Sequence, residues 1–255
     1  MTRALPRVFL LPGIGGDEPG LANLRSELAD SADFVLVDHP DIDRPSAEIR
    51  DFAGIVARAV ARIHDVEPSG KVNIAGYSFG AQVAFAAACE LQEQGREVGL
   101  LALFDSRALS LSVAGRRVSN SDEASGPVRT IADVASRLLI AGGLAEPLRR
   151  AIPAVGSVFG KPASLGLRRL LLQNLRGRSL AGHRTGHFDG TIVLFRAGEQ
   201  HIAGLPHDLG WSAHCAEVRG VELRGGHNSL FRAENLAENA ALIRSAIARP
   251  LSAGS

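Results

Sequence analysis

A serine at the centre of a Gly-x-Ser-x-Gly pentapeptide is the residue of this chain best placed to do chemistry. The pentapeptide GYSFG spans residues 76–80, after an apolar, β-branched run at residues 72–75 and before a helix-forming run at residues 81–94. A sharp strand-to-helix turn of this kind holds a serine in a strained backbone, and its small residues let neighbouring segments approach. The pattern therefore predicts that Ser78 is a nucleophile.

A late histidine is the candidate base for this serine. A serine hydroxyl is a weak nucleophile at neutral pH, so Ser78 needs a base within hydrogen-bond reach and a group that orients the base. Of the eight histidines, His227 is the best placed, because it follows the strand-like run at residues 218–223 and precedes the terminal helix. A loop there lies at the same edge of a parallel sheet as the serine turn.

Two carboxylates are candidates for the group that orients His227. Asp105 ends the strand-like run at residues 100–104, and Glu199 follows the next run at residues 192–195. The later position is the commoner one for the acid of such a site. A buried acid that fixes the imidazole tautomer should end an apolar strand, which Asp105 does most cleanly. From the residues alone, both assignments stay open.

A glycine-rich loop follows the first strand-like run. Residues 12–16 read PGIGG, and glycine lets the backbone turn inward there. In a site of this kind, one N–H group for a developing oxyanion comes from this loop and the other from the residue after the nucleophile. The sequence therefore predicts backbone donors at Ile14 and Phe79.

The elements around these residues alternate between strand and helix. The clearest helix is predicted over residues 48–64, where apolar residues recur at helical spacing and Ser46 is placed as N-cap. Such alternation predicts an α/β fold with a mostly parallel sheet covered by helices. The predicted strands are residues 8–11, 34–38, 72–75, 100–104, 192–195 and 218–223.

A dinucleotide-binding fold is a weaker interpretation of the same alternation. Gly13 and Gly15 follow the first strand, and Asp38 ends the second, where an acid that binds ribose would lie. However, Glu18 occupies the position of the third glycine of that fingerprint, so the motif is incomplete.

The alternation stops between Asp105 and Thr191. This part contains Leu-rich helical segments, predicted at residues 131–141 and 165–175, and no convincing strand. We therefore expect residues 1–106 and 185–255 to form the core, and residues 107–184 to form a helical lid insertion over the carboxyl ends of the strands.

Charge sets the predicted insertion apart from the rest of the chain. Residues 107–184 contain thirteen Lys and Arg against four acids, a net charge of +9, whereas the remaining residues carry −8. Such a segregated charge favours an acidic partner or substrate for this segment, although solvated arginines on amphipathic helices would look the same.

Several classes of protein do not fit the composition. No apolar run is long and uncharged enough to span a bilayer, and residues 8–11 are too few for the core of a signal peptide. Cys89 and Cys215 give neither a disulfide framework nor metal-ligand spacing, which favours a reducing compartment and a cytoplasmic protein. No cofactor, metal, nucleic acid or membrane partner is expected.

Four motifs together resemble one family. The segments GYSFGA, LFDS, PGIGG and GH, at residues 76–81, 103–106, 12–16 and 226–227, are similar to those of thioesterase domains from nonribosomal peptide and polyketide assembly lines. The resemblance covers nearly the whole chain and implies an α/β-hydrolase fold. It also implies a triad of Ser78, Asp105 and His227, and so favours Asp105 over Glu199.

The resemblance implies a function as well. In that family an acyl or peptidyl chain arrives on the phosphopantetheine arm of a carrier protein, is transferred to the serine, and is released by water or an internal nucleophile. Carrier proteins are typically acidic, so the basic residues 107–184 would suit their docking, as they would suit an anionic substrate. Two other functions remain: a carboxylesterase or acyltransferase acting on free small esters, and a catalytically silent carrier-protein binding module.

Overall fold

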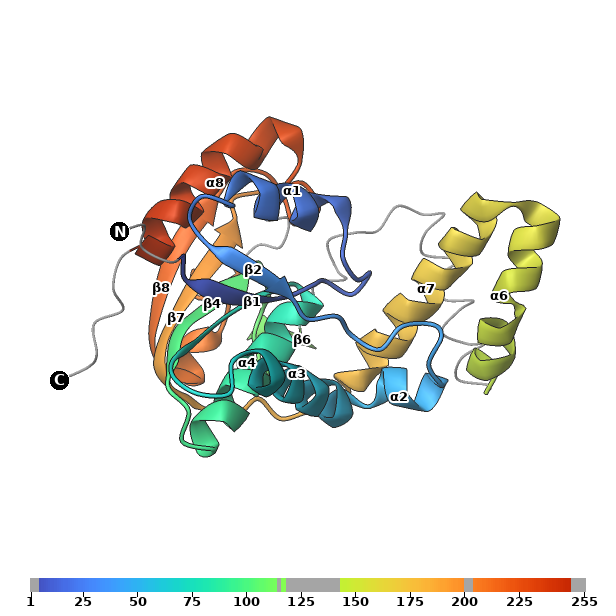
Figure 1. The fold of residues 1–255 in the computed structure, drawn as a ribbon, viewed down its shortest axis with the longest axis horizontal. Helices are drawn as coiled ribbons and strands as arrows, with labels where there is room; N and C mark the ends of the chain where they lie inside the picture. Colours follow the sequence, from blue (N-terminus) through green and yellow to red (C-terminus); the bar gives the residue numbers. More distant parts are fainter. Residues whose placement is uncertain (1–4, 114–115, 118–142, 200–203, 249–255) are drawn as a thin grey trace.

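A twisted parallel sheet forms the centre of the molecule (Figure 1). The computed structural model describes residues 5–113, 116–117, 143–199 and 204–248. Six strands follow the order β2-β1-β3-β4-β7-β8, and every neighbouring pair is parallel. They are β1 (Arg7–Leu11), β2 (Asp33–Leu36), β3 (Val72–Tyr77), β4 (Val98–Phe104), β7 (Phe188–Ala197) and β8 (Cys215–Leu223).

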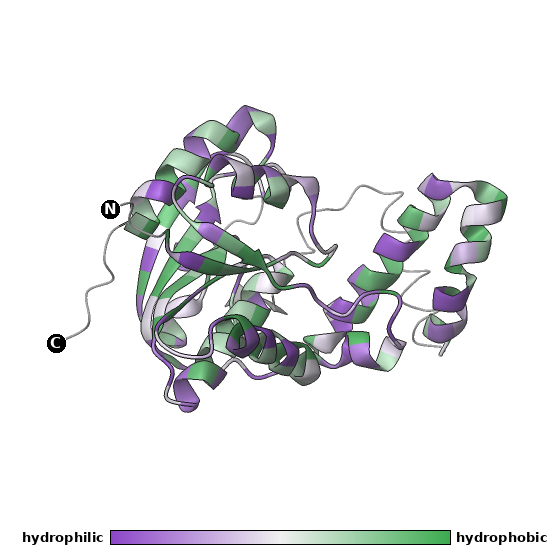
Figure 2. Ribbon diagram, viewed as in Figure 1, coloured by the Kyte–Doolittle hydropathy of each residue, from purple (hydrophilic) through white to green (hydrophobic). Residues whose placement is uncertain are grey.

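Helices cover both faces of this sheet. The helices α3 (Phe52–Val66) and α4 (Phe79–Glu93) pack on one face, and α1 (Pro19–Glu27) and α8 (Ala233–Ala248) pack on the other. Side chains of β1 join the two apolar clusters alternately, which explains why buried parallel strands read as continuous apolar runs. Figure 2 shows the hydrophobic residues concentrated on the strands. The predicted α/β architecture is confirmed.

The predicted helix over residues 48–64 is divided in the structure. A short helix α2 (Ser46–Arg50) ends at Asp51, whose extended backbone leads into α3. Ile49 packs against leucines of the insertion, whereas Phe52 joins the core beneath the sheet, so the helix breaks between two apolar clusters. The predicted N-cap role of Ser46 is wrong: this residue lies inside α2, and its hydroxyl donates to Glu146 at 2.9 Å.

The strand ends also differ from those predicted. β7 and β8 are longer than the runs at residues 192–195 and 218–223, because their pairing continues back to Phe188 and Cys215 through polar residues. β2 ends at Leu36, two residues before Asp38. Apolar patterning underestimates β7 and β8, which pair with each other beyond the buried part of the sheet.

The chain leaves the sheet between β4 and β7. Here α6 (Ala145–Phe159) and α7 (Lys161–Ser179) form a pair that stands apart from the layered sheet (Figure 1). The predicted helix at residues 165–175 lies within α7, and the predicted helix at residues 131–141 lies outside the described residues. The expectation of no strand is wrong in one detail, since β5 (Ser112–Val113) and β6 (Arg116–Arg117) pair antiparallel.

Within the described residues, no helix is both long and apolar enough to cross a membrane. The same residues contain no group of three His, Cys, Asp or Glu side chains that could hold a metal ion. Cys89 and Cys215 are both buried free thiols.

Candidate active site

Ser78 lies in the turn between β3 and α4, with a backbone conformation that few non-glycine residues adopt. Its φ is 57° and its ψ is −114°, which is strained for a residue with a side chain. A Cβ at Gly76 would lie 2.3 Å from the carbonyl oxygen of Gly80, and one at Gly80 would lie 2.3 Å from that of Pro12. The two glycines of the pentapeptide are therefore needed for the turn to close.

Asp105 is the first residue after β4 and is 4% exposed. Its φ of 45° is again unusual. Its Oδ1 accepts a hydrogen bond from the N–H of Ala197 at 2.8 Å. Burial alone would raise its pKa, but the hydrogen bond from His227, the backbone donor and the nearby charge of Arg107 outweigh burial and hold the pKa below its usual value. The carboxylate is therefore ionised at neutral pH.

His227 joins the other two side chains. Its Nδ1 lies 2.7 Å from Asp105 Oδ2, and its Nε2 lies 3.0 Å from Ser78 Oγ. Because an ionised carboxylate only accepts hydrogen bonds, Nδ1 carries the imidazole proton and Nε2 is left to accept from the serine hydroxyl. The three predicted side chains thus form one hydrogen-bonded chain, an arrangement that is suited to nucleophilic acyl transfer.

Glu199 occupies a different place from Asp105. Its side chain is exposed, and its backbone N–H donates to the carbonyl oxygen of Gly225 at 3.1 Å. His227 donates its imidazole proton to Asp105, which follows β4. Glu199 follows β7, the neighbouring strand in the sheet.

Tyr77 supports His227, a contact that the sequence motif did not reveal. Its hydroxyl donates to the carbonyl oxygen of His227 at 2.7 Å, and the two rings stack with centroids 5.0 Å apart. Tyr77 is the only tyrosine of the chain and occupies a variable position of the pentapeptide. Its position next to Ser78 indicates that it lies near the site, but the sequence does not indicate its partner, which is 150 residues away.

The two predicted backbone donors lie on neighbouring segments. Phe79 is the first residue of α4, where the free N–H groups of a helix favour negative charge. Ile14 lies in the loop of residues 12–16 after β1, and the close contact between Gly80 and Pro12 brings that loop against the serine turn. Neither N–H donates to another of the residues that the structure describes.

His39 holds this loop from behind. It is buried, and its Nε2–H donates to the carbonyl oxygen of Pro12 at 2.9 Å. Burial and the charge of Arg176 lower the pKa of His39 to about 3, against the opposing effect of the Pro12 hydrogen bond. The imidazole is therefore neutral at every pH at which the protein is expected to work.

We expect this neutral histidine to make the protein acid-sensitive. Between about pH 3 and the unfolded pKa of about 6.5, the unfolded chain binds one more proton than the folded one. The free energy of unfolding should therefore fall by roughly 1 kcal/mol for each pH unit below that pKa. Urea denaturation of the wild type and of His39→Gln at pH 7, 6, 5 and 4 measures this; equal slopes in both proteins would contradict the assignment.

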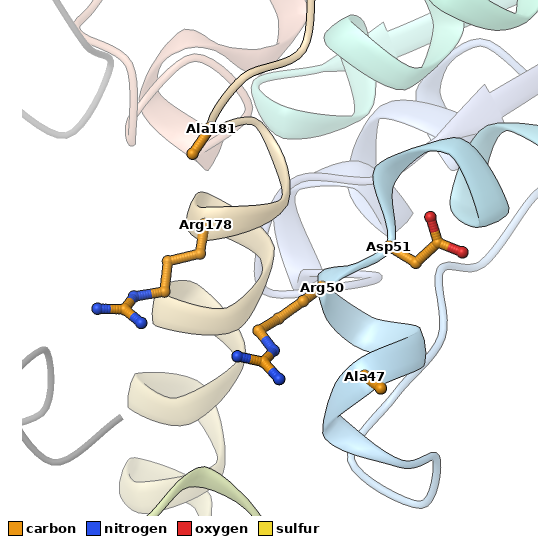
Figure 3. Close-up of a pocket in the computed structure, with 5 residues that line it drawn as sticks. All are labelled: Ala47, Arg50, Asp51, Arg178 and Ala181. Atoms are coloured by element: carbon orange, nitrogen blue, oxygen red, sulfur yellow. The ribbon is translucent and has the colours of Figure 1, made fainter. Parts of the chain in front are cut away.

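An open pocket of about 660 Å³ lies between α2 and the end of α7 (Figure 3). Arg50 and Arg178 line it and extend their guanidinium groups to the same side, while Asp51 points away. None of the pocket residues belongs to the Ser78–His227–Asp105 chain. Phe52, which follows Asp51, makes an edge contact with Phe79, the residue after Ser78.

A parallel α/β sheet with a serine turn, an aspartate and a histidine at one edge defines the α/β-hydrolase class of serine hydrolases. The sequence model described as "Thioesterase domain" matches residues 6–240. The chain accordingly belongs to the thioesterase-domain family, and the family resemblance of its motifs is confirmed.

Known relatives and solved structures agree with this membership. Indigoidine synthase of Streptomyces lavendulae is 26% identical over 252 residues, which are 88% of this chain and 18% of that protein. The NocB thioesterase domain superposes with a TM-score of 0.69 at 20% identity, covering 96% of this chain and 95% of that one. The surfactin thioesterase domain SrfTE gives 0.63 at 22%, covering 96% and 92%.

At such identities the two solved structures establish the fold. The chain spans less than a fifth of the length of the curated relatives that it matches, which are much larger synthases. The chain is therefore related to the chain-release thioesterase domains of peptide and polyketide synthases.

Proposed function

We propose that this chain releases an acyl or peptidyl group from the phosphopantetheine thiol of a carrier protein, through an acyl intermediate on Ser78. The observation that carries the proposal is the hydrogen-bonded chain from Ser78 Oγ through His227 to Asp105, with distances of 3.0 and 2.7 Å. The relation to thioesterase domains of carrier-dependent synthases supports the thioester as substrate.

The first half of the proposed reaction forms the acyl-enzyme. His227 Nε2 takes the proton of Ser78 as Oγ attacks the thioester carbonyl, and the ionised Asp105 stabilises the imidazolium that results. The backbone N–H groups of Ile14 and Phe79 would stabilise the oxyanion. Collapse of the tetrahedral intermediate breaks the C–S bond, and the proton on His227 passes to the departing thiol.

The second half removes the acyl group from Ser78. His227 takes a proton from water or from a hydroxyl or amine of the acyl chain itself, and that oxygen or nitrogen attacks the ester carbonyl. Collapse then returns the proton to Ser78 Oγ and releases a free acid or a cyclic product. The outcome depends on which nucleophile reaches the ester.

A substrate comparison tests the proposed function. We expect acyl-pantetheine thioesters to be turned over with a higher kcat/KM than p-nitrophenyl esters of the same acyl group. The reverse order would favour a carboxylesterase or acyltransferase acting on free esters. Failure of a fluorophosphonate to label Ser78 would favour a catalytically silent binding module.

We also infer that residues 107–184 form a lid that receives the acidic carrier protein. Several arginines of this segment are already engaged: Arg149 donates to the carbonyl oxygen of Ile42 and to Glu146, and Arg168 pairs with Asp41. Arg178 is exposed at the end of α7 and lines the pocket together with Arg50 of α2. Because both guanidinium groups extend to the same side of this pocket, we propose it as the docking surface.

Charge reversal at this pocket should weaken carrier recognition selectively. We expect Arg178→Glu to raise KM for a carrier-bound thioester roughly three- to tenfold at low salt, and to leave a free pantetheine thioester nearly unaffected. The difference should shrink as the Debye length falls from about 30 Å at 0.01 M salt to about 8 Å at 0.15 M. Steady-state kinetics on both substrates measures this effect.

Arg62→Glu is the matched control, because Arg62 is exposed on α3 and does not line the pocket. This variant should behave as the wild type does. Equal losses on the carrier-bound and the free substrate in Arg178→Glu would contradict the docking proposal and indicate an anionic substrate site.

A further inference from the structure

Three successive carbonyl oxygens of the loop after β1 each accept a hydrogen bond. Pro12 O accepts from His39 at 2.9 Å, Gly13 O accepts from the N–H of Gly16 at 3.0 Å, and Ile14 O accepts from Arg176 at 2.6 Å. Buried backbone carbonyls must find partners, yet three donors of different origin on consecutive residues are more than a simple turn requires. The loop is fixed peptide by peptide.

This arrangement decides where the N–H groups of the loop point. In a trans peptide the carbonyl of one residue and the N–H of the next point in opposite directions. With Gly13 O held by Gly16, the N–H of Ile14 is directed away from that turn. The hydrogen bond on Ile14 O fixes the next peptide, so the backbone on both sides of Ile14 is restrained.

Arg176 is an unusual residue to provide that restraint. It lies on α7 of the insertion, 162 residues from Ile14, and is 1% exposed. Its second terminal nitrogen donates to the carbonyl oxygen of Pro40 at 2.8 Å. Burial lowers the pKa of Arg176 to about 10, so the guanidinium stays charged at neutral pH.

The cost of this placement points to a function. A buried charge is expensive unless it is paired. The hydrogen bonds of this guanidinium go to two neutral carbonyl oxygens of the loops after β1 and β2, with the charges of Asp41 and Asp38 nearby, and its Nε has no hydrogen-bond partner within the described residues. What the guanidinium adds is two directed donors, one that connects α7 to the loop carrying Ile14 and one that connects it to the loop after β2.

We propose that Arg176 is a positioning residue that holds the loop of residues 12–16, here called the oxyanion loop, in its active conformation. Arg176 thereby couples the insertion to catalysis. The inference rests on the proposed function, in which the N–H of Ile14 stabilises the oxyanion. Without Arg176, a loop with glycines at positions 13, 15 and 16 can relax into other conformations. The N–H of Ile14 would then be misplaced, and the transition state would lose a donor that the ground state hardly uses.

Two variants and one control test this proposal. Arg176→Met removes the donors and keeps much of the side-chain length, and Arg176→Lys keeps the charge and a donor. Arg149→Met is the control, because Arg149 also ties the insertion to the loop after β2, through the carbonyl oxygen of Ile42 at 3.0 Å. The hydrogen bonds of that arginine go to Ile42 and Glu146, and neither residue belongs to the loop of residues 12–16.

The readouts separate positioning from a structural role. For Arg176→Met we expect kcat on an acyl-pantetheine to fall about tenfold to a hundredfold with KM nearly unchanged. The inhibition constant of a boronic acid, whose tetrahedral adduct on Ser78 places an oxygen in the oxyanion site, should rise by a similar factor. Arg176→Lys should recover part of both losses, and Arg149→Met should show neither.

Other outcomes would overturn the proposal. A fall in melting temperature with unchanged kcat and unchanged boronate affinity in the folded fraction would make Arg176 purely structural, as would equal kinetic losses in Arg149→Met. If Arg176→Met fails to fold, Arg176→Lys decides, because a misdirected donor should still separate kcat from KM. Failure of the proposed function itself is distinguishable: a wild type that binds the boronic acid on Ser78 but does not turn over the acyl-pantetheine would contradict the thioesterase function, while the boronate affinities of the variants would still test the role of Arg176.

Discussion

Replacing Ser78 by alanine is expected to lower kcat by about 10⁶ without changing the fold. In the proposed mechanism the hydroxyl is the attacking group, and no neighbouring side chain replaces it. We expect the fold to persist because the hydroxyl is hydrogen-bonded to His227, another residue of the proposed site. Rates on an acyl-pantetheine, together with a thermal melting curve, measure both parts of this prediction.

A second serine provides the control. Ser106 directly follows Asp105 and is fully buried, and its hydroxyl accepts a hydrogen bond from the side-chain amide of Gln82 at 2.7 Å. We expect Ser106→Ala to keep most of the activity. A Ser78→Ala protein that retains even a tenth of wild-type turnover with a native melting curve would rule out Ser78 as the nucleophile.

Asp105→Asn is expected to cost about 10³- to 10⁴-fold in kcat, against less than tenfold for Glu199→Gln. The asparagine fits the space of the aspartate but presents an amide donor to Nδ1 of His227, which favours the wrong imidazole tautomer. Glu199 is exposed, and the imidazole proton is directed to Asp105 instead.

The two carboxylate variants control for each other, because each changes one acid to its amide. The measurement is kcat/KM on one thioester with both proteins. If Glu199→Gln were the more damaging change, the acid would follow β7, as in the commoner hydrolase arrangement, and the role proposed for Asp105 would be wrong.

The candidate site was predictable because its signals are local. Ser78, Asp105 and His227 each follow a strand-like run, and the carboxyl ends of parallel strands meet at one edge of the sheet. The periodicity of the apolar residues therefore sufficed to bring together side chains that lie far apart in the sequence. The strained backbone at Ser78 was likewise implied by the glycines around it.

The supporting contacts were not predictable, because each joins distant segments through a side chain of no special type. Tyr77 reaches the His227 carbonyl, Ser46 reaches Glu146, and Arg176 reaches Ile14. No pattern in the sequence relates these partners. The division of the predicted helix at Asp51 has the same origin, since it depends on where the insertion packs.

Several of the positive charges of the insertion are used within the chain itself. The net charge of +9 favours an acidic partner, but Arg149, Arg168 and Arg176 are bound by carboxylates and carbonyls of the chain itself. Part of the excess therefore attaches the insertion to the core. The proposed docking surface therefore rests on the exposed arginines that line the pocket, Arg50 and Arg178, and not on the net charge of the segment.

The central claim is that the reaction passes through an acyl group on Ser78. Intact-protein mass spectrometry after rapid acid quenching of the protein with an acyl-pantetheine tests it most directly. We predict a mass increase equal to the acyl group, mapped by peptide analysis to Ser78 and absent from Ser78→Ala. Turnover with no adduct in the wild type at the shortest quench times, or an adduct of equal yield in Ser78→Ala, would contradict the account.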